Sequence, residues 1–163
     1  MTDHGKTFLA RLVAPSGRTS RGRTIVRLIL GAMLAFAGVS HLTIAREEFK
    51  AQVPKFVPLD ADLVVVASGF AEIILGAALM LLARRRVPVG WVVALFFIAV
   101  FPGNIAQWLH ARDGFGLDTD SKRLVRLFFQ PALIAVTLWS TGAWKDRARV
   151  SPPHSDTPQA DRK

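Results

Sequence analysis

The chain has 163 residues, 51% of them apolar, and its 21 Lys and Arg outnumber 12 Asp and Glu for a formal net charge of +9. So basic a balance fits a nucleic-acid-binding protein, but the mean hydropathy of +0.32 and the long charge-poor runs between short basic stretches are typical of a multi-pass membrane protein. We therefore expect a lipid bilayer rather than a nucleic acid as partner. The absence of cysteine excludes disulfide exchange, thiolate metal sites and thiol nucleophiles.

Four apolar stretches each approach the roughly 20 residues that a helix needs to cross about 30 Å of hydrocarbon. They cover about residues 25–45, 61–83, 87–109 and 124–143. Lipid offers the backbone no hydrogen-bond partners, so each stretch is predicted to be a helix and the domain 25–143 an all-α, four-helix membrane bundle. The third and fourth stretches contain Pro102 and Pro131, which we expect to kink these helices rather than end them.

Positive charge is unequally divided between the segments outside the four stretches. The basic tail 1–24, the connection 84–86 and the tail 144–163 would lie on one side of the membrane and carry 13 Lys and Arg, against 6 on the other side. The positive-inside rule therefore predicts a multi-pass membrane protein with both termini in the cytoplasm. The tail 144–163 is rich in Pro and polar residues and is predicted to be disordered. Arg27 and Arg126 lie near the ends of their stretches, where their side chains are expected to extend to the membrane surface.

The first stretch carries a stripe of small and polar residues. Arg27, Gly31, Ala35, Gly38 and His41 follow one another at intervals of three or four residues, which places them on one side of a helix. Small residues on such a stripe let a second helix approach closely, so His41 is expected to point into the bundle. This inward face, and a length beyond that of a usual signal-sequence core, argue against a cleaved N-terminal signal.

Glu72 lies near the middle of the second stretch, with Gly69 and Gly76 on its own face. A carboxylate at that depth is unfavourable unless it is protonated or meets polar partners, and intramembrane acids are disproportionately functional. We interpret Glu72 as the catalytic candidate, in the role of a proton acceptor. The structural alternative is a protonated Glu72 that hydrogen-bonds Ser68 or a neighbouring backbone group.

Polar residues of the third and fourth stretches also follow a helical spacing. Asn104, Gln107 and His110 recur every three residues after Pro102, whose ring leaves the carbonyl of Ile98 without its amide partner. In the predicted topology, polar groups from all four helices meet in the outer half of the bundle. The candidate binding residues beside Glu72 are His41, Ser68, Asn104, Gln107, Arg126 and Gln130.

Three kinds of function suit such a layer. A quinone needs donors such as His, Arg, Asn or Gln for its carbonyl groups, and a proton relay of the kind that His41 and Glu72 provide. A haem held by His41 and His110 is a second hypothesis, although no haem motif surrounds either residue. In the third, Glu72 and Arg126 form a structural ion pair, and the bundle is a non-enzymatic scaffold that binds a partner. We expect a quinone rather than a haem as ligand, and no metal site.

Four short strings occur in a fixed order along the chain. They read GVSHL at residues 38–42, VPKFVP at 53–58, SGFAEIILG at 68–76 and VFPGNI at 100–105. Their order and spacing resemble the DoxX-like family of small bacterial four-helix membrane proteins. The resemblance covers about residues 25–143 and implies a multi-pass protein of the inner membrane that is a subunit of a redox complex, with a soluble or membrane oxidoreductase subunit as partner.

In the best understood branch of that family, the complex is a thiosulfate:quinone oxidoreductase. The strings at 38–42 and 100–105 look closer to a branch without assigned activity, so thiosulfate is not carried over as the substrate. The bundle is also similar to quinone-linked thiol oxidoreductases, whose chemistry needs cysteine pairs that this chain lacks. The resemblance therefore implies a quinone-linked membrane subunit and leaves open whether the chain itself catalyses a reaction.

Overall fold

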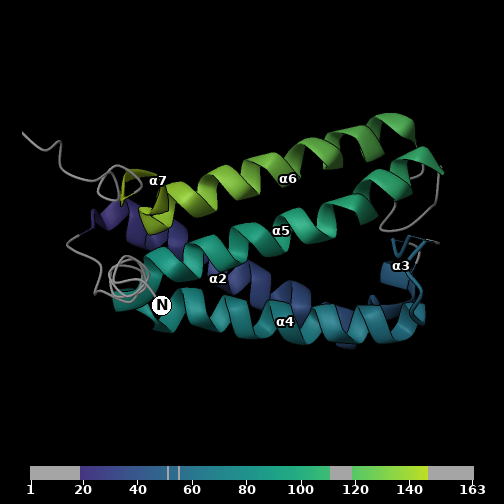
Figure 1. The fold of residues 1–163 in the computed structure, drawn as a ribbon, viewed down its shortest axis with the longest axis horizontal. Coiled ribbons are helices and arrows are strands. Elements are labelled where there is room, and N and C mark those ends of the chain that lie inside the picture. The colour runs from purple at the N-terminus through teal and green to yellow at the C-terminus, as the bar shows by residue number, and fades with distance from the viewer. Residues whose placement is uncertain (1–18, 51, 55, 111–118, 147–163) are drawn as a thin grey trace, which may run out of the picture.

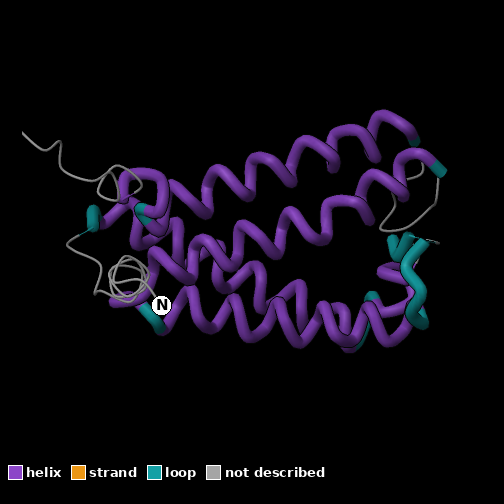
Figure 2. The backbone as a smooth tube through the Cα atoms, viewed as in Figure 1, coloured by secondary structure: helices purple, strands orange, loops and turns teal. Residues whose placement is uncertain are grey.

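The computed structural model describes residues 19–50, 52–54, 56–110 and 119–146, without the side chains of residues 145 and 146. Over these residues the chain consists of helices and short connections, and no strand occurs among them (Figure 2). The four long helices are α2 (Arg21–Leu42), α4 (Ala61–Leu81), α5 (Arg86–Leu109) and α6 (Asp120–Thr141). The short ones are α3 (Arg46–Lys50), η1 (Ala83–Arg85) and α7 (Ala143–Asp146). The prediction of a helical chain is confirmed for this part of it.

The four long helices are long and apolar enough to cross a membrane, and they match the four predicted stretches to within four residues at every end. Two of them begin early because a hydroxyl caps the first turn. Ser20 Oγ accepts the backbone N–H of Arg23 at 3.4 Å, and Thr119 Oγ1 accepts that of Lys122 at 3.4 Å. α6 ends at Gly142, whose φ of 80° is left-handed and stops the helix.

The observed helix ends test the predictions for the two prolines and for part of the C-terminal tail. α5 continues through Pro102 and α6 through Pro131, so neither proline ends its helix. Residues 1–18 and 147–163 lie outside the described residues, and the disorder expected for the tail 144–163 stays a prediction. Of that tail, residues 144–146 belong to α7.

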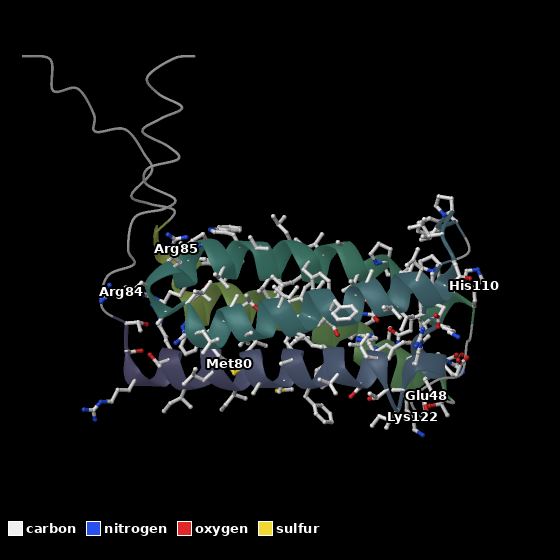
Figure 3. All side chains as sticks on the ribbon, turned by 90° about the horizontal axis from the view of Figure 1, so that it is seen from below. Glu48, Met80, Arg84, Arg85, His110 and Lys122 are labelled. Atoms are coloured by element: carbon white, nitrogen blue, oxygen red, sulfur yellow. The ribbon has the colours of Figure 1, made fainter. Side chains whose placement is uncertain are left out.

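The four long helices are arranged as two pairs (Figure 1). α2 packs along α4 and α5 packs along α6, whereas the two pairs touch each other less. At one end of the bundle, here called the η1 end, η1 joins α4 to α5, α2 begins, and α7 packs against α5 and α6. α3 lies at the opposite end, here called the α3 end. Figure 3 shows Arg84 and Arg85 at the η1 end, and Glu48, His110 and Lys122 at the α3 end.

α2 and α4 touch through two glycine pairs. A Cβ atom added to Gly38 would lie 2.5 Å from the carbonyl oxygen of Gly69, and one added to Gly76 would lie 2.5 Å from that of Gly31. Real Cβ atoms do not approach a carbonyl so closely, so only glycine lets these backbones meet. The small-residue stripe of the first stretch is thus the surface that packs against the glycines beside Glu72.

The core lies between the helix pairs, and the outer faces of the helices are apolar as well. Its central buried cluster consists of Leu30, Leu34, Leu79, Val93 and Phe97. Many large apolar side chains are exposed on the outward faces, among them Phe36, Ile74 and Leu95. Apolar exposure on this scale is unusual for a protein surrounded by water. It is compatible with contact between these helices and a lipid bilayer.

Arg27 corrects one expectation about the charges. Its side chain does not extend to the surface, because the residue is only 4% exposed. Its Nη1 donates to the carbonyl oxygens of Leu79 and Met80, which belong to the last turn of α4. Carbonyls of a last turn lack partners within their own helix, and a cation beside them is also favoured by the helix dipole. Arg27 of α2 therefore caps the end of α4.

We predict that Gly38→Ala destabilises the protein, because the added methyl group forces α2 away from α4. Overpacking of this kind costs about 1–3 kcal/mol, which unfolding by denaturant in detergent micelles measures. Gly22→Ala is the matched control, since nothing lies within 4 Å of a Cβ at Gly22. An equal stability of the two variants would contradict the close approach of α2 and α4.

Candidate functional site

A cavity of about 440 Å³ lies between the two helix pairs, toward the α3 end of the bundle. Small-molecule sites commonly have volumes of about 300–1,000 Å³. α5 and α6 diverge from α2 and α4 in this direction (Figure 1), and all four helices contribute to a mostly apolar lining. The polar side chains that line the cavity are His41, Gln52, Ser68, Glu72, Asn104, Arg126 and Gln130.

His41 and Glu72 form a buried pair in this cavity. Nδ1 of His41 lies 2.5 Å from Oε2 of Glu72, and the two side chains are 8% and 11% exposed. Neither atom has another hydrogen-bond partner among the described residues, so a single proton held between them satisfies both. α2 and α4 run in opposite directions, and helical side chains lean toward the N-terminus of their own helix, which points these two toward each other. Gly69 makes room for them, because a Cβ there would lie 2.9 Å from that of His41.

Glu72 forms a hydrogen bond or ion pair with neither of the two side chains that the structural hypotheses gave it as partners, Ser68 and Arg126. Ser68 donates its hydroxyl to the carbonyl oxygen of Val65 at 2.9 Å, within its own helix, rather than to Glu72. Arg126 lines the same cavity, but the ion-pair partner of Glu72 among the described residues is His41. The ion pair of Glu72 with Arg126, which belongs to the scaffold hypothesis, does not occur among the described residues; Glu72 pairs with His41, across the two helices that the glycine pairs hold together.

Gln130 links α6 to α5 beside the proline of α5. Its Oε1 accepts from Nδ2 of Asn104 at 3.1 Å, and its Nε2 donates to the carbonyl oxygen of Phe97 at 2.7 Å. The carbonyl that Pro102 leaves without an amide is that of Ile98, so Gln130 reaches the carbonyl next to it. Oδ1 of Asn104 accepts no hydrogen bond from the residues that the structure describes. Gln130 thus holds α6 to α5, whereas the Oδ1 atom of Asn104 can accept a hydrogen bond from a ligand in the cavity.

The end of the cavity is covered by α3 with residues 52–54, 56 and 57, here called the cover. The Phe49 ring packs against the His41 ring. Arg126 donates from Nη2 to Oε1 of Gln52 at 3.1 Å, and Nε2 of Gln52 is buried with no partner among the described residues. The glycine at position 103 lets the cover lie on α5, because a Cβ there would be 2.9 Å from the backbone carbonyl oxygen of Gln52.

Sequence reasoning missed both Phe49 and Gln52. They lie in a short connection between two apolar stretches, where no helical periodicity relates them to the other candidates. The nearest sequence feature that points to this region is the string VPKFVP at 53–58. It supports the DoxX-like resemblance through its prolines, and it gives no reason to consider Phe49 or Gln52.

Charged residues hold the cover against the first turn of α4. Nε of Arg46 donates to Oδ1 of Asp62 at 2.8 Å, and Nζ of Lys50 lies 2.7 Å from Oε1 of Glu47 and 3.0 Å from Oδ1 of Asp62. The hydrogen bond to Asp62 raises the pKa of Arg46, and those to Glu47 and then to Asp62 raise the pKa of Lys50. Asp60 caps the same turn by accepting the backbone N–H of Asp62 at 2.9 Å. These contacts hold α3 against α4 at the α3 end of the bundle.

Two polar residues near the end of α5 lie outside the cavity. Gln107 is 1% exposed and does not line the cavity, because it lies a turn beyond Asn104, where the lining ends. Its predicted contact with a ligand therefore gains no support. His110 is exposed at the α3 end (Figure 3), and its Nδ1 donates to the carbonyl oxygen of Ala106 at 2.8 Å. His41 and His110 thus do not face a common cavity, which removes the geometric basis for a haem held by both.

Comparison with known proteins places the chain in one family. Residues 30–141 match the family described as Domain of unknown function (DUF8561). The chain belongs to this family. Every residue that lines the cavity lies within the matched range. No curated protein and no solved structure matches the chain, so the resemblance to the DoxX-like family stays a prediction.

We predict that His41 and Glu72 are energetically coupled in this DUF8561 protein. In a double-mutant cycle, His41→Leu and Glu72→Leu together should destabilise less than the sum of the single changes, by about 1.5–3 kcal/mol for a charge-assisted bond. Unfolding free energies in detergent measure this difference. The control cycle combines Glu72→Leu with Arg126→Leu and should be additive within about 0.5 kcal/mol. Coupling in the control cycle alone would contradict the pairing of His41 with Glu72.

Proposed function

We propose that this protein is a multi-pass protein of the inner membrane, and that its cavity binds the ring of a quinone as the membrane subunit of a redox complex. The observation that supports this most is the convergence of six polar candidates, taken from four separate apolar stretches, on one otherwise apolar cavity. Buried polar groups are unfavourable in a lipid-facing bundle unless they have partners. Helix packing alone gives no reason to gather them around a single space.

Charge supports a membrane orientation with both termini in the cytoplasm. The η1 end carries Arg84, Arg85 and Arg86 next to the start of α2. Arg21 and Arg23 lie at the same end, whereas the described Lys and Arg at the α3 end are Arg46, Lys50, Lys122 and Arg123. The positive-inside rule assigns the more basic end to the cytoplasm, which here is the η1 end. The cavity then lies in the outer half of the membrane.

The donors of the cavity suit the carbonyl oxygens of a quinone. Nε2 of Gln52 is a buried donor that lacks a partner among the described residues, and a ring carbonyl would supply the missing acceptor. The guanidinium of Arg126 lies beside it and strengthens such a bond through its charge. On this proposal Gln52 and Arg126 hold one side of the ring, and Asn104 contacts its edge.

The pair of His41 and Glu72 supplies the proton chemistry of the proposal. Oxidation of a quinol releases two electrons and two protons, and reduction of a quinone takes up the same number. In the first direction one ring hydroxyl gives its proton to the pair of His41 and Glu72, which then holds it together with the proton between the two side chains, and the other hydroxyl gives its proton to water. In the second direction the pair and water return these two protons. The electrons pass to or from an oxidoreductase subunit, the partner that the DoxX-like resemblance implies.

A non-enzymatic scaffold is the second candidate function. It is favoured by Gln130, whose amide is engaged with Asn104 and with the backbone of Phe97 and so holds α5 to α6. His41 and Glu72 also satisfy each other without a ligand. In a scaffold these bonds stabilise the bundle, and a partner complex binds elsewhere on its surface.

We predict that the protein purified from its native membrane retains a quinone that solvent extraction and absorption spectroscopy detect. Glu72→Leu and Arg126→Leu should each lower the affinity about 10- to 100-fold, the effect of losing one charge-assisted bond. Ser140→Ala is the control, since Ser140 is fully buried, donates to the carbonyl of Thr137 in its own helix and does not line the cavity. A folded protein that retains and binds no quinone would favour the scaffold.

The proposed topology predicts which ends of the bundle react with a membrane-impermeant maleimide. The natural chain has no cysteine, so Glu48→Cys and Arg84→Cys each introduce a single reactive thiol at an exposed position. Glu48→Cys should be labelled from the outer side of intact spheroplasts, and Arg84→Cys only after the membrane is permeabilised. Labelling of both variants on the same side would contradict the four membrane crossings.

A further inference from the structure

We propose that the ligand of this cavity enters sideways from the bilayer through an opening between α4 and α5, and that it is a ring compound with an apolar tail. The tail remains in this opening while the ring lies beside Glu72. This inference rests on the proposed function. It adds the route by which the ligand enters and the presence of an apolar tail that stays in the bilayer.

The cover closes the route from the water-facing end of the bundle. Phe49, Val53, Pro54 and Val57 line the cavity from this side and are apolar. Two anchors hold the cover in place, the ion pairs of Arg46 and Lys50 with Asp62 and the contact of the Gln52 backbone with Gly103 on α5. A water-soluble ligand would have to displace both anchors to enter here.

The side of the bundle between α4 and α5 is more open. The turn η1 joins these two helices at the η1 end, and they contact each other less than α2 contacts α4 or α6. They separate toward the α3 end (Figure 1). Ala99 and Pro102 on α5 and Phe56 of the cover line the cavity and are at the same time exposed, with 74% exposure at Phe56. Met33 on α2 also lines the cavity and is exposed, but α2 packs more closely against α4 and α6 than α4 packs against α5, so we place the mouth at Ala99 and Pro102.

The position of this mouth determines the class of ligand. Ala99 lies in the middle of α5, so in a membrane-spanning bundle the mouth opens into hydrocarbon and not into water. Ala99 and Pro102 are apolar, whereas Glu72 and the Nε2 atom of Gln52, which line the same cavity, are buried. A molecule with a polar ring and an apolar tail matches this gradient, because its ring finds donors inside and its tail stays in lipid.

The first test compares two benzoquinones in nanodiscs that hold the full chain, one with a tail of two isoprene units and one without a tail. After subtraction of binding to empty nanodiscs, the tailed quinone should bind at least tenfold more tightly. Ala99→Phe should remove this preference, and Ile98→Phe should leave it unchanged, because Ile98 is 53% exposed but does not line the cavity. Equal binding of both quinones, or an effect of Met33→Phe on α2 in place of Ala99→Phe, would overturn lateral entry between α4 and α5 while leaving the quinone site intact.

The second test needs no quinone and so separates this inference from the proposed function. A nitroxide attached to Ser68→Cys, on the lining of the cavity, reports collisions with oxygen from lipid and with a nickel chelate from water. Oxygen should broaden its signal several-fold more than the chelate, and Ala99→Phe but not Ile98→Phe should reduce the oxygen effect. A dominant effect of the nickel chelate would show that the cavity opens to water and would overturn the inference even if quinone binds.

Discussion

The close approach of α2 and α4 is the contact on which the rest of the structure depends. Gly31 and Gly38 of α2 meet Gly76 and Gly69 of α4 at distances that exclude any side chain. This contact holds two antiparallel helices at a fixed register, and the register brings His41 opposite Glu72. In a low-dielectric interior a histidine and a carboxylate at such a separation stabilise each other, whereas either one alone would be unfavourable.

The second pair of helices is held by different means, and the cavity results from this difference. At the η1 end Gly90 leaves room for the side chain of Thr141, and nearer the middle Gln130 of α6 bonds to α5. The two pairs are then joined by η1 at one end and by the cover at the other. Between these joints the pairs diverge, and polar groups of both pairs line the space that remains.

The polar groups of the cavity fall into two kinds with different consequences. His41 with Glu72, and Gln130 with Asn104, are bonded across helices and stabilise the bundle whether or not a ligand binds. The Nε2 of Gln52 is a buried donor without an acceptor among the described residues, which is unfavourable in the empty protein. A ligand that supplies an acceptor there removes this penalty.

Hydropathy and helical spacing determined the four long helices, their ends to within four residues, and six of the polar side chains that meet at the cavity. These features are local, because a run of apolar residues and a spacing of three or four positions are properties of one helix at a time. The partners of these side chains were decided by the tertiary structure alone. Glu72 pairs with His41 rather than Ser68 or Arg126, Arg27 caps α4 instead of reaching the surface, and the cover places Gln52 in the cavity. Each of these contacts joins residues of different elements, and their geometry depends on how closely the glycines let two backbones approach, a distance that no single stretch of sequence specifies.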